Sequence, residues 1–117
     1  MPYDQKLAER INKRLAKQPG LVDKKMFGGV AFLINGNLAV FVHGNELGVR
    51  MDPEDTAKLL TKPYTRLFDM GGRTMKGWIL VGPKALATSA AMGKWIDIGI
   101  EYAESLPKKK APVKKKT

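Results

Sequence analysis

Cysteine is absent from the 117-residue chain, and histidine occurs once, at His43. Without a thiol the chain can form no disulfide framework, no thiolate nucleophile and no Cys-ligated zinc site. A single imidazole leaves one candidate for any His-based catalysis. The sequence also lacks a Gly-x-Ser-x-Gly elbow and any His, Asp and Glu cluster with metal-ligand spacing. We therefore expect a protein that is not an enzyme and has no catalytic residue, metal site or cofactor.

Long apolar runs are missing as well. The longest mostly apolar stretch, Met26 to Ile34, is far shorter than the ~20 residues that a membrane-spanning helix requires. The N-terminus carries Asp4 and Lys6 and shows no apolar signal region. These absences predict a cytoplasmic protein that has no membrane partner.

Acidic residues are few, and the resulting net charge of +10 is unevenly distributed. Residues 1–107 hold 15 Lys and Arg against 11 Asp and Glu, a net charge of +4. The last ten residues hold six Lys and no acid. The composition of residues 108–117 predicts a disordered lysine-rich tail, and residues 1–107 have the size and composition of one globular domain.

The first element that the pattern predicts is an amphipathic helix over residues 4–18. Asp4 is the expected N-cap, and Pro19-Gly20 ends the helix. The apolar face consists of Leu7, Ala8, Ile11 and Leu15, and the outer face carries Lys6, Arg10, Lys13, Arg14 and Lys17.

Four strands follow in the predicted order. The first is Val22–Met26. Val30–Ile34 and Leu38–Val42 then flank Asn35-Gly36, a strong signal for a type I′ hairpin. The fourth, Glu46–Met51, alternates apolar and other residues, which indicates one buried face and one open face that carries Arg50.

The remaining elements complete an α+β pattern. A helix begins at Asp52 and runs to about Thr61, Leu67-Phe68 fits an extra short strand, and Gly77–Val81 reads as a buried strand. Pro83 opens a helical region with a break around Thr88-Ser89, and its last helix presents Trp95, Ile98, Tyr102 and Leu106 on one face. The order α-β-β-β-β-α-β-α predicts an antiparallel meander sheet with the N-terminal, middle and C-terminal helices against one face.

Several segments resemble a known family. They are Lys25-Met26-Phe27-Gly28-Gly29-Val30-Ala31-Phe32, Asn35-Gly36, Leu47-Gly48-Val49-Arg50, Phe68-Asp69-Met70-Gly71-Gly72-Arg73-Thr74-Met75-Lys76-Gly77-Trp78 and Tyr102-Ala103-Glu104-Ser105-Leu106-Pro107. Together they resemble the N-terminal domain of the TfoX (Sxy) competence regulators over about residues 4–107. The resemblance implies a small α+β fold with a helix-flanked antiparallel sheet. Full-length regulators of this type promote expression of DNA-uptake genes in some bacteria and carry a second, helical domain. The present chain ends in lysines instead, and we expect a stand-alone single-domain member.

Three other features fit ordinary structural roles better than chemistry. Asp52, Glu54 and Asp55 suit the start of a helix, where acids are favoured. The glycines of residues 71–77 lack phosphate-loop spacing and precede a strand, so they are expected in a turn. The aromatic side chains of Phe27, Phe41 and Trp78 lie in apolar runs and are expected in the core.

Two basic features are candidate binding sites. If the fold brings them together, five side chains would form a patch for phosphate or an acidic partner: Lys24, Lys25, Arg50, Arg73 and Lys76. The simpler interpretation is a scattered, solvated surface. The tail offers Lys108, Lys109, Lys110, Lys114, Lys115 and Lys116, which suit salt-sensitive, sequence-independent contact with nucleic acid. The alternative for the tail is a solubilising end without a partner.

These observations favour a non-enzymatic interaction or regulatory module whose partner is nucleic acid or an acidic protein. The alternative is a small-molecule-binding or enzymatic domain, which would require a deep pocket containing His43, Arg50 or Arg73. The sequence does not specify an oligomeric state.

Overall fold

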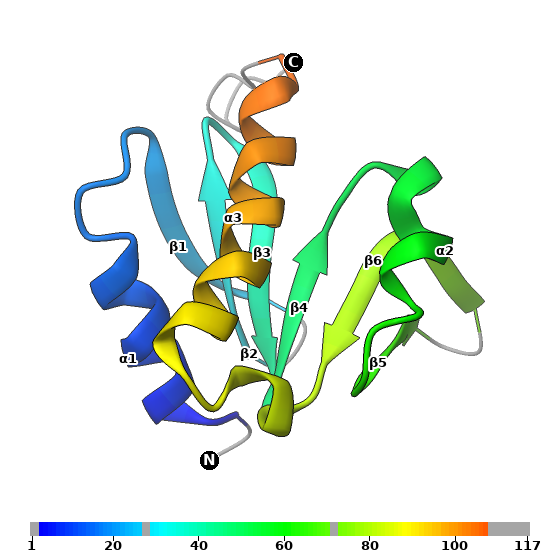
Figure 1. Ribbon diagram of the computed structural model, residues 1–117. Coiled ribbons are helices and arrows are strands. Elements are labelled where there is room, and N and C mark those ends of the chain that lie inside the picture. Colours follow the sequence, from blue (N-terminus) through cyan, green and yellow to red (C-terminus); the bar gives the residue numbers. More distant parts are fainter. Residues whose placement is uncertain (1–2, 27–28, 71–72, 108–117) are drawn as a thin grey trace.

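The computed structural model describes residues 3–26, 29–70 and 73–107, which form one six-stranded antiparallel sheet in the order β1-β2-β3-β4-β6-β5 (Figure 1). The strands are β1 (Leu21–Met26), β2 (Gly29–Ile34), β3 (Asn37–His43), β4 (Glu46–Arg50), β5 (Thr65–Met70) and β6 (Arg73–Val81). The helices are α1 (Gln5–Arg14), α2 (Thr56–Leu59) and α3 (Ser89–Ser105), with short 3-10 helices η1 (Pro53–Asp55) and η2 (Pro83–Leu86). The α+β class and the antiparallel sheet are confirmed.

The turn between β2 and β3 has the predicted hairpin geometry. Asn35 and Gly36 both have positive φ, 53° and 84°, as a type I′ turn requires. Ile34 then pairs with Asn37 at the start of β3. Asn37 Nδ2 donates a hydrogen bond to the carbonyl oxygen of Pro107 at 2.9 Å, which ties the segment after α3 to the sheet.

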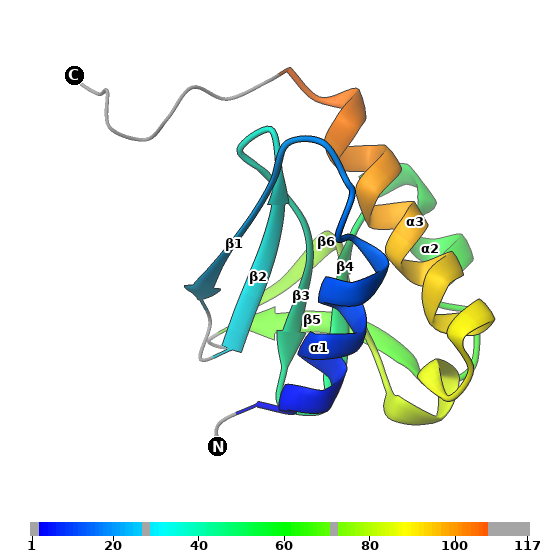
Figure 2. The same cartoon turned by 90° about the vertical axis from the view of Figure 1, so that its left-hand side faces the viewer.

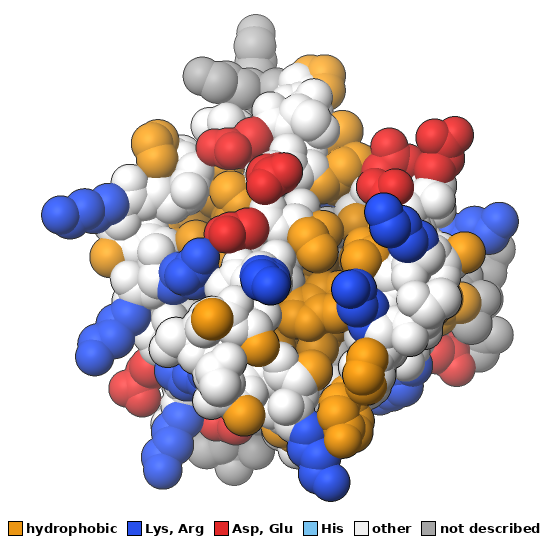
Figure 3. Space-filling model, in the orientation of Figure 1, with side chains coloured by type: hydrophobic (Ala, Val, Ile, Leu, Met, Phe, Trp, Pro, Cys, Tyr) orange, Lys and Arg blue, Asp and Glu red, His pale blue; other side chains and the backbone are white. Residues whose placement is uncertain are grey.

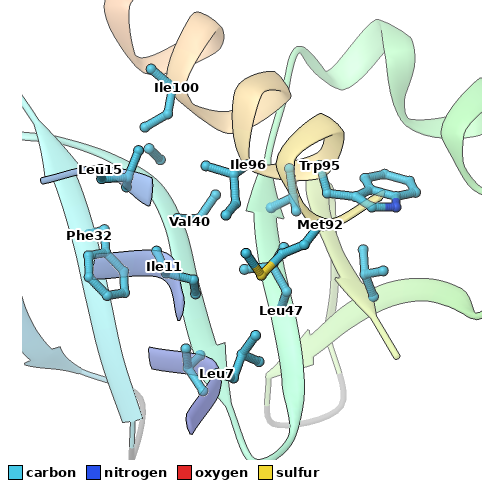
Figure 4. Packing of buried hydrophobic residues seen from close by; sticks show 14 of the residues in the cluster. Leu7, Ile11, Leu15, Phe32, Val40, Leu47, Met92, Trp95, Ile96 and Ile100 are labelled. Carbon is cyan, nitrogen blue, oxygen red and sulfur yellow. The ribbon is translucent and has the colours of Figure 1, made fainter. Parts of the chain in front are cut away.

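Helix α1 begins and packs as the sequence predicts but ends earlier. Asp4 Oδ1 accepts hydrogen bonds from the backbone N–H groups of Lys6 and Leu7, at 2.9 and 3.2 Å. The apolar side chains of α1 meet those of α3 over the sheet (Figure 4). The helix ends at Arg14 instead of residue 18. Pro19 disfavours helical geometry at the residue before it, so the chain leaves α1 through a turn.

Helix α3 also begins as predicted, but a different face is buried. Thr88 caps it, and its Oγ1 accepts from the N–H of Ala91 at 3.1 Å. The buried residues are Met92, Gly93, Trp95, Ile96, Gly99, Ile100 and Ala103. The predicted Ile98 and Tyr102 are only half-buried. Gly99 decides this orientation, because it lets α3 approach β3 closely. A Cβ at Gly99 would lie 2.5 Å from the Ala39 carbonyl oxygen.

The face of the sheet opposite α1 and α3 is also buried at its centre. Ala31, Phe41, Gly48 and Leu80 pair in a row across β2, β3, β4 and β6, and all four are buried. The Phe41 ring lies over Gly48, where a Cβ would overlap it, with its centroid 5.1 Å from that of Phe68. The predicted open face of β4 is therefore wrong at Gly48, because a second hydrophobic cluster covers it.

The β5–β6 hairpin is longer than the sequence indicated, and a bulge turns it. The expected short strand at Leu67-Phe68 is part of β5, and β6 begins before Gly77. Leu67 pairs with Ile79 but Phe68 pairs with Met75, so residues 76–78 are extra on β6. Figure 2 shows β5 running across the direction of β2 and β3. This bend carries Phe68 over Phe41.

Candidate functional site

Two of the five predicted patch residues, Arg50 and Lys76, lie on the neighbouring strands β4 and β6. Arg50 ends β4 and pairs with Trp78 of β6, and the exposed Lys76 lies two residues before Trp78. Lys24 and Lys25 are exposed on β1, which β2 and β3 separate from β4. At the usual strand spacing of about 4.8 Å, β1 lies about 14 Å from β4.

The other predicted basic residues are described only in part or not at all. Arg73 begins β6, but its side chain lies outside the described part of the structure. The tail residues Lys108, Lys109, Lys110, Lys114, Lys115 and Lys116 also lie outside it. The binding role of these residues stays a prediction.

Arg50 is half-buried between two aromatic rings. Its Cζ lies 5.5 Å from the ring centroid of Trp78 and 5.4 Å from that of Tyr102 on α3. Contacts of this kind hold a guanidinium in place and leave its N–H groups available. Within the described ranges, the Arg50 guanidinium has no hydrogen-bond or ion-pair partner. The arrangement presents a fixed cation with an unused donor fork, which suits a carboxylate or another oxyanion.

Arg50 adjoins a hollow between α3 and the segment η1–α2. The hollow has a volume of about 380 Å³, and Met51, Leu59, Ile98 and Tyr102 provide its apolar surface. Tyr102 belongs both to this surface and to the aromatic pair around Arg50. Figure 3 shows hydrophobic side chains gathered along the hollow. It is therefore a groove with apolar and charged lining residues, and Arg50 adjoins it at Tyr102.

The edges of the same groove are mainly acidic. Asp52 and Asp55 lie on one side, Glu101 lies on α3, and Lys58 is the single lysine among the lining residues. All four are exposed. A polyanion such as nucleic acid would be repelled by this edge, whereas a segment with basic residues would be attracted to it.

Residues considered for catalysis have structural contacts. The His43 ring lies 5.6 Å from that of Phe68, in an edge-on arrangement. Asp52 Oδ1 accepts from the N–H of Glu54 at 2.9 Å, as expected at the start of a helix. No group of three or more His, Cys, Asp or Glu residues in the described part of the chain could hold a metal ion. No helix there is long and apolar enough to cross a membrane.

Comparison with known families places the fold. A family model described as the TfoX N-terminal domain matches residues 13–103, more than three quarters of the chain. The chain belongs to the TfoX N-terminal domain family. Searches of the curated proteins and of the solved structures found no match.

The groove and the residues around Arg50 lie within the part of the chain that matches the TfoX N-terminal domain. Arg50, Trp78 and Tyr102 all lie within the matched range, and so does every residue that lines the groove. The lysine-rich tail lies outside it. The TfoX N-terminal domain is not a known family of enzymes.

Sequence reasoning selected Arg50 but missed its surroundings. Alternation placed Arg50 on an open face, whereas the structure sets it between Trp78 and Tyr102. The sequence does carry a signal for Tyr102, because this aromatic residue occupies the edge of the apolar face of α3. Nothing in the pattern connects it to a residue 52 positions earlier.

Proposed function

We propose that this TfoX N-terminal domain is a non-enzymatic interaction module that binds a segment of a partner protein in the groove between α2 and α3. The observation that carries the proposal is Arg50, held between Trp78 and Tyr102 with no acidic partner in the described structure. A buried or half-buried arginine beside aromatic and apolar surface is typical of the residues that dominate binding energy at protein interfaces.

The chemistry of the groove specifies the segment. Its apolar surface favours a segment with one or two apolar side chains, and the Arg50 guanidinium favours a carboxylate beside them. The acidic side chains along its edges, Asp52, Asp55 and Glu101, favour a basic residue in the same segment. The expected ligand is a short segment that combines apolar side chains with an acidic and a basic residue. A peptide segment can reach this groove from the surface, because its charged lining residues are exposed.

Selection from a random peptide library displayed on phage tests the proposal. We expect the selected peptides to share this combination of acidic, apolar and basic residues. Replacing Arg50→Gln should lower their affinity about tenfold or more, because the charged hydrogen bonds at a hot spot are lost. The matched control is Lys84→Gln, which removes another cation, 5.9 Å from the ring centroid of Tyr64, outside the groove. Peptides that bind both variants equally would contradict the groove as the site.

We also propose that the tail adds weak, sequence-independent contact with nucleic acid. The charge distribution supports it, since the last ten residues carry six lysines and no acid. The full chain should bind a short DNA duplex with an affinity that falls steeply as salt increases. Each phosphate contact contributes about 0.9 to the slope of log K against log salt concentration.

Removal of residues 108–117 isolates the contribution of the tail. We expect the truncated chain to lose most of the DNA affinity and most of the salt slope, measured by fluorescence anisotropy. An unchanged slope would show that the domain, and not the tail, makes the phosphate contacts. Selected peptides should bind the truncated and full chains alike, because the groove lies within the domain.

A further inference from the structure

A second cavity, separate from the groove, lies between α1 and the beginning of α3. It has a volume of about 520 Å³ and is lined by Arg10, Lys13, Arg14, Ser89 and Met92. Three of these five residues are cations. They stand at positions i, i+3 and i+4 of α1, so they lie along one side of that helix. The sequence predicts them on the outer face of α1, and Lys13 and Arg14 are exposed there, while the two arginines also contact Leu86 and Asp97. Figure 1 shows α1 beside the first turns of α3.

Both arginines of this cavity are held in position. Arg10 Nη2 donates a hydrogen bond to the Leu86 carbonyl oxygen at 2.7 Å. The Arg14 guanidinium packs on Gly93, where a Cβ would lie 2.5 Å from Arg14 Cζ. Arg14 Nη2 also donates to Asp97 Oδ2 at 3.2 Å. A guanidinium has five N–H donors, so each arginine keeps several for a ligand. Side chains already fixed in this way lose less entropy when a ligand binds.

The charges of the cavity are not balanced. No acid lines it, and the one acid that pairs with its cations in the described structure is the exposed Asp97. The Lys13 ammonium has no hydrogen-bond or ion-pair partner within the described ranges. Like charges three and four residues apart on a helix repel one another. An anion in the cavity would relieve this repulsion, and it would find three cationic groups at once.

From this arrangement we infer that the cavity between α1 and α3 binds a phosphate group, either as the free ion or as the monoester of a small molecule. Two arginine forks match the oxygens of a phosphate group, and the Lys13 ammonium adds a third charge. The Ser89 hydroxyl is a further donor at the cavity wall. The volume exceeds what the ion alone needs and falls in the range of small-ligand sites, and Met92 offers apolar contact to the rest of a phosphorylated molecule. This inference does not depend on the proposed peptide groove.

An NMR titration of the full chain at constant ionic strength tests the inference, with inorganic phosphate, glucose 6-phosphate and glucose as probes. We expect saturable shifts of the amide signals of Lys13, Ser89 and their neighbours in α1 and α3 with both phosphates, and none with glucose. Tighter binding of glucose 6-phosphate would identify a phosphorylated small molecule as the ligand, and equal binding would identify the free ion. Shifts that do not saturate, or that appear equally at Lys76 and Lys84, would overturn the site.

The variant Ser89→Asp separates binding from folding. It places a carboxylate in the cavity wall, and an acid at the first position of a helix favours that helix. We therefore expect an equal or higher melting temperature but phosphate affinity lower by about tenfold or more.

Lys13→Gln should also weaken phosphate binding. The matched control Lys17→Gln, on the exposed end of the same segment, should not. Undiminished phosphate binding in both Ser89→Asp and Lys13→Gln would exclude the cavity. Peptide binding in the groove should be the same in all three variants.

Discussion

Replacing Phe41 with alanine is expected to destabilise the domain by about 3–5 kcal/mol, the usual cost of removing a fully buried phenylalanine ring. The Phe41 side chain is completely buried on the face of the sheet that faces away from α1 and α3. Its ring fills the space over Gly48 and lies against Phe68 and Trp78, with centroid distances of 5.1 and 5.9 Å. The cavity left by its removal could not close, because β2 and β4 hold the backbone of β3 on both sides. Urea unfolding gives the change in the free energy of unfolding.

Phe32→Ala is the matched comparison for this prediction. Phe32 is equally buried but lies on the helix-covered face. If both faces belong to the core, the two substitutions should cost similar amounts, and Phe41→Leu should cost less than about 1.5 kcal/mol. A small effect of Phe41→Ala beside a large effect of Phe32→Ala would show that the second cluster contributes little to stability.

Gly77→Ala is expected to be the next most damaging change, at about 3 kcal/mol, because positive φ and a backbone collision add together. Gly77 has φ of 86°, and a Cβ on it would lie 2.8 Å from the Met51 carbonyl oxygen. Its N–H donates to the buried Thr56 Oγ1 at 2.8 Å, and its carbonyl accepts from the N–H of Met51. The residue therefore cannot shift without breaking the contacts that join the bulge of β6 to η1 and α2.

Gly44→Ala separates the two contributions. Gly44 also has positive φ, at 60°, but a Cβ there would meet nothing within 4 Å. We expect it to cost only about 1 kcal/mol, the price of the left-handed conformation alone. Thermal and urea unfolding of both variants give the difference. Equal costs for the two glycines would mean that the bulge adapts to a side chain and does not fix the hairpin.

Local patterns were sufficient for most of the elements. Asp4 and the Asn35-Gly36 turn behaved as predicted, because an N-cap and a type I′ turn depend on a few adjacent residues. The break that the sequence predicts around Thr88-Ser89 is local in the same sense, because the Thr88 side chain caps α3 there. Asp52 likewise acts only on the start of the helix that follows it.

The candidate sites were predicted only in part. Arg50 could be selected from its strand, but its aromatic neighbours come from β6 and α3. Arg10, Lys13 and Arg14 form a visible basic stripe. That the stripe faces Ser89 depends on how closely α3 packs beside α1, which no local pattern states.

The sequence by itself determined the family, the element order and the concentration of positive charge in the last ten residues, because composition and short-range periodicity are properties of neighbouring residues. The tertiary structure alone decided that the sheet has two buried faces, that Arg50 lies beside a groove and that three cations of α1 share a cavity. These features arise where residues far apart in the chain meet. The bulge at residues 76–78 and the close approach of α3 at Gly99 set those meetings, through backbone contacts that the sequence does not display.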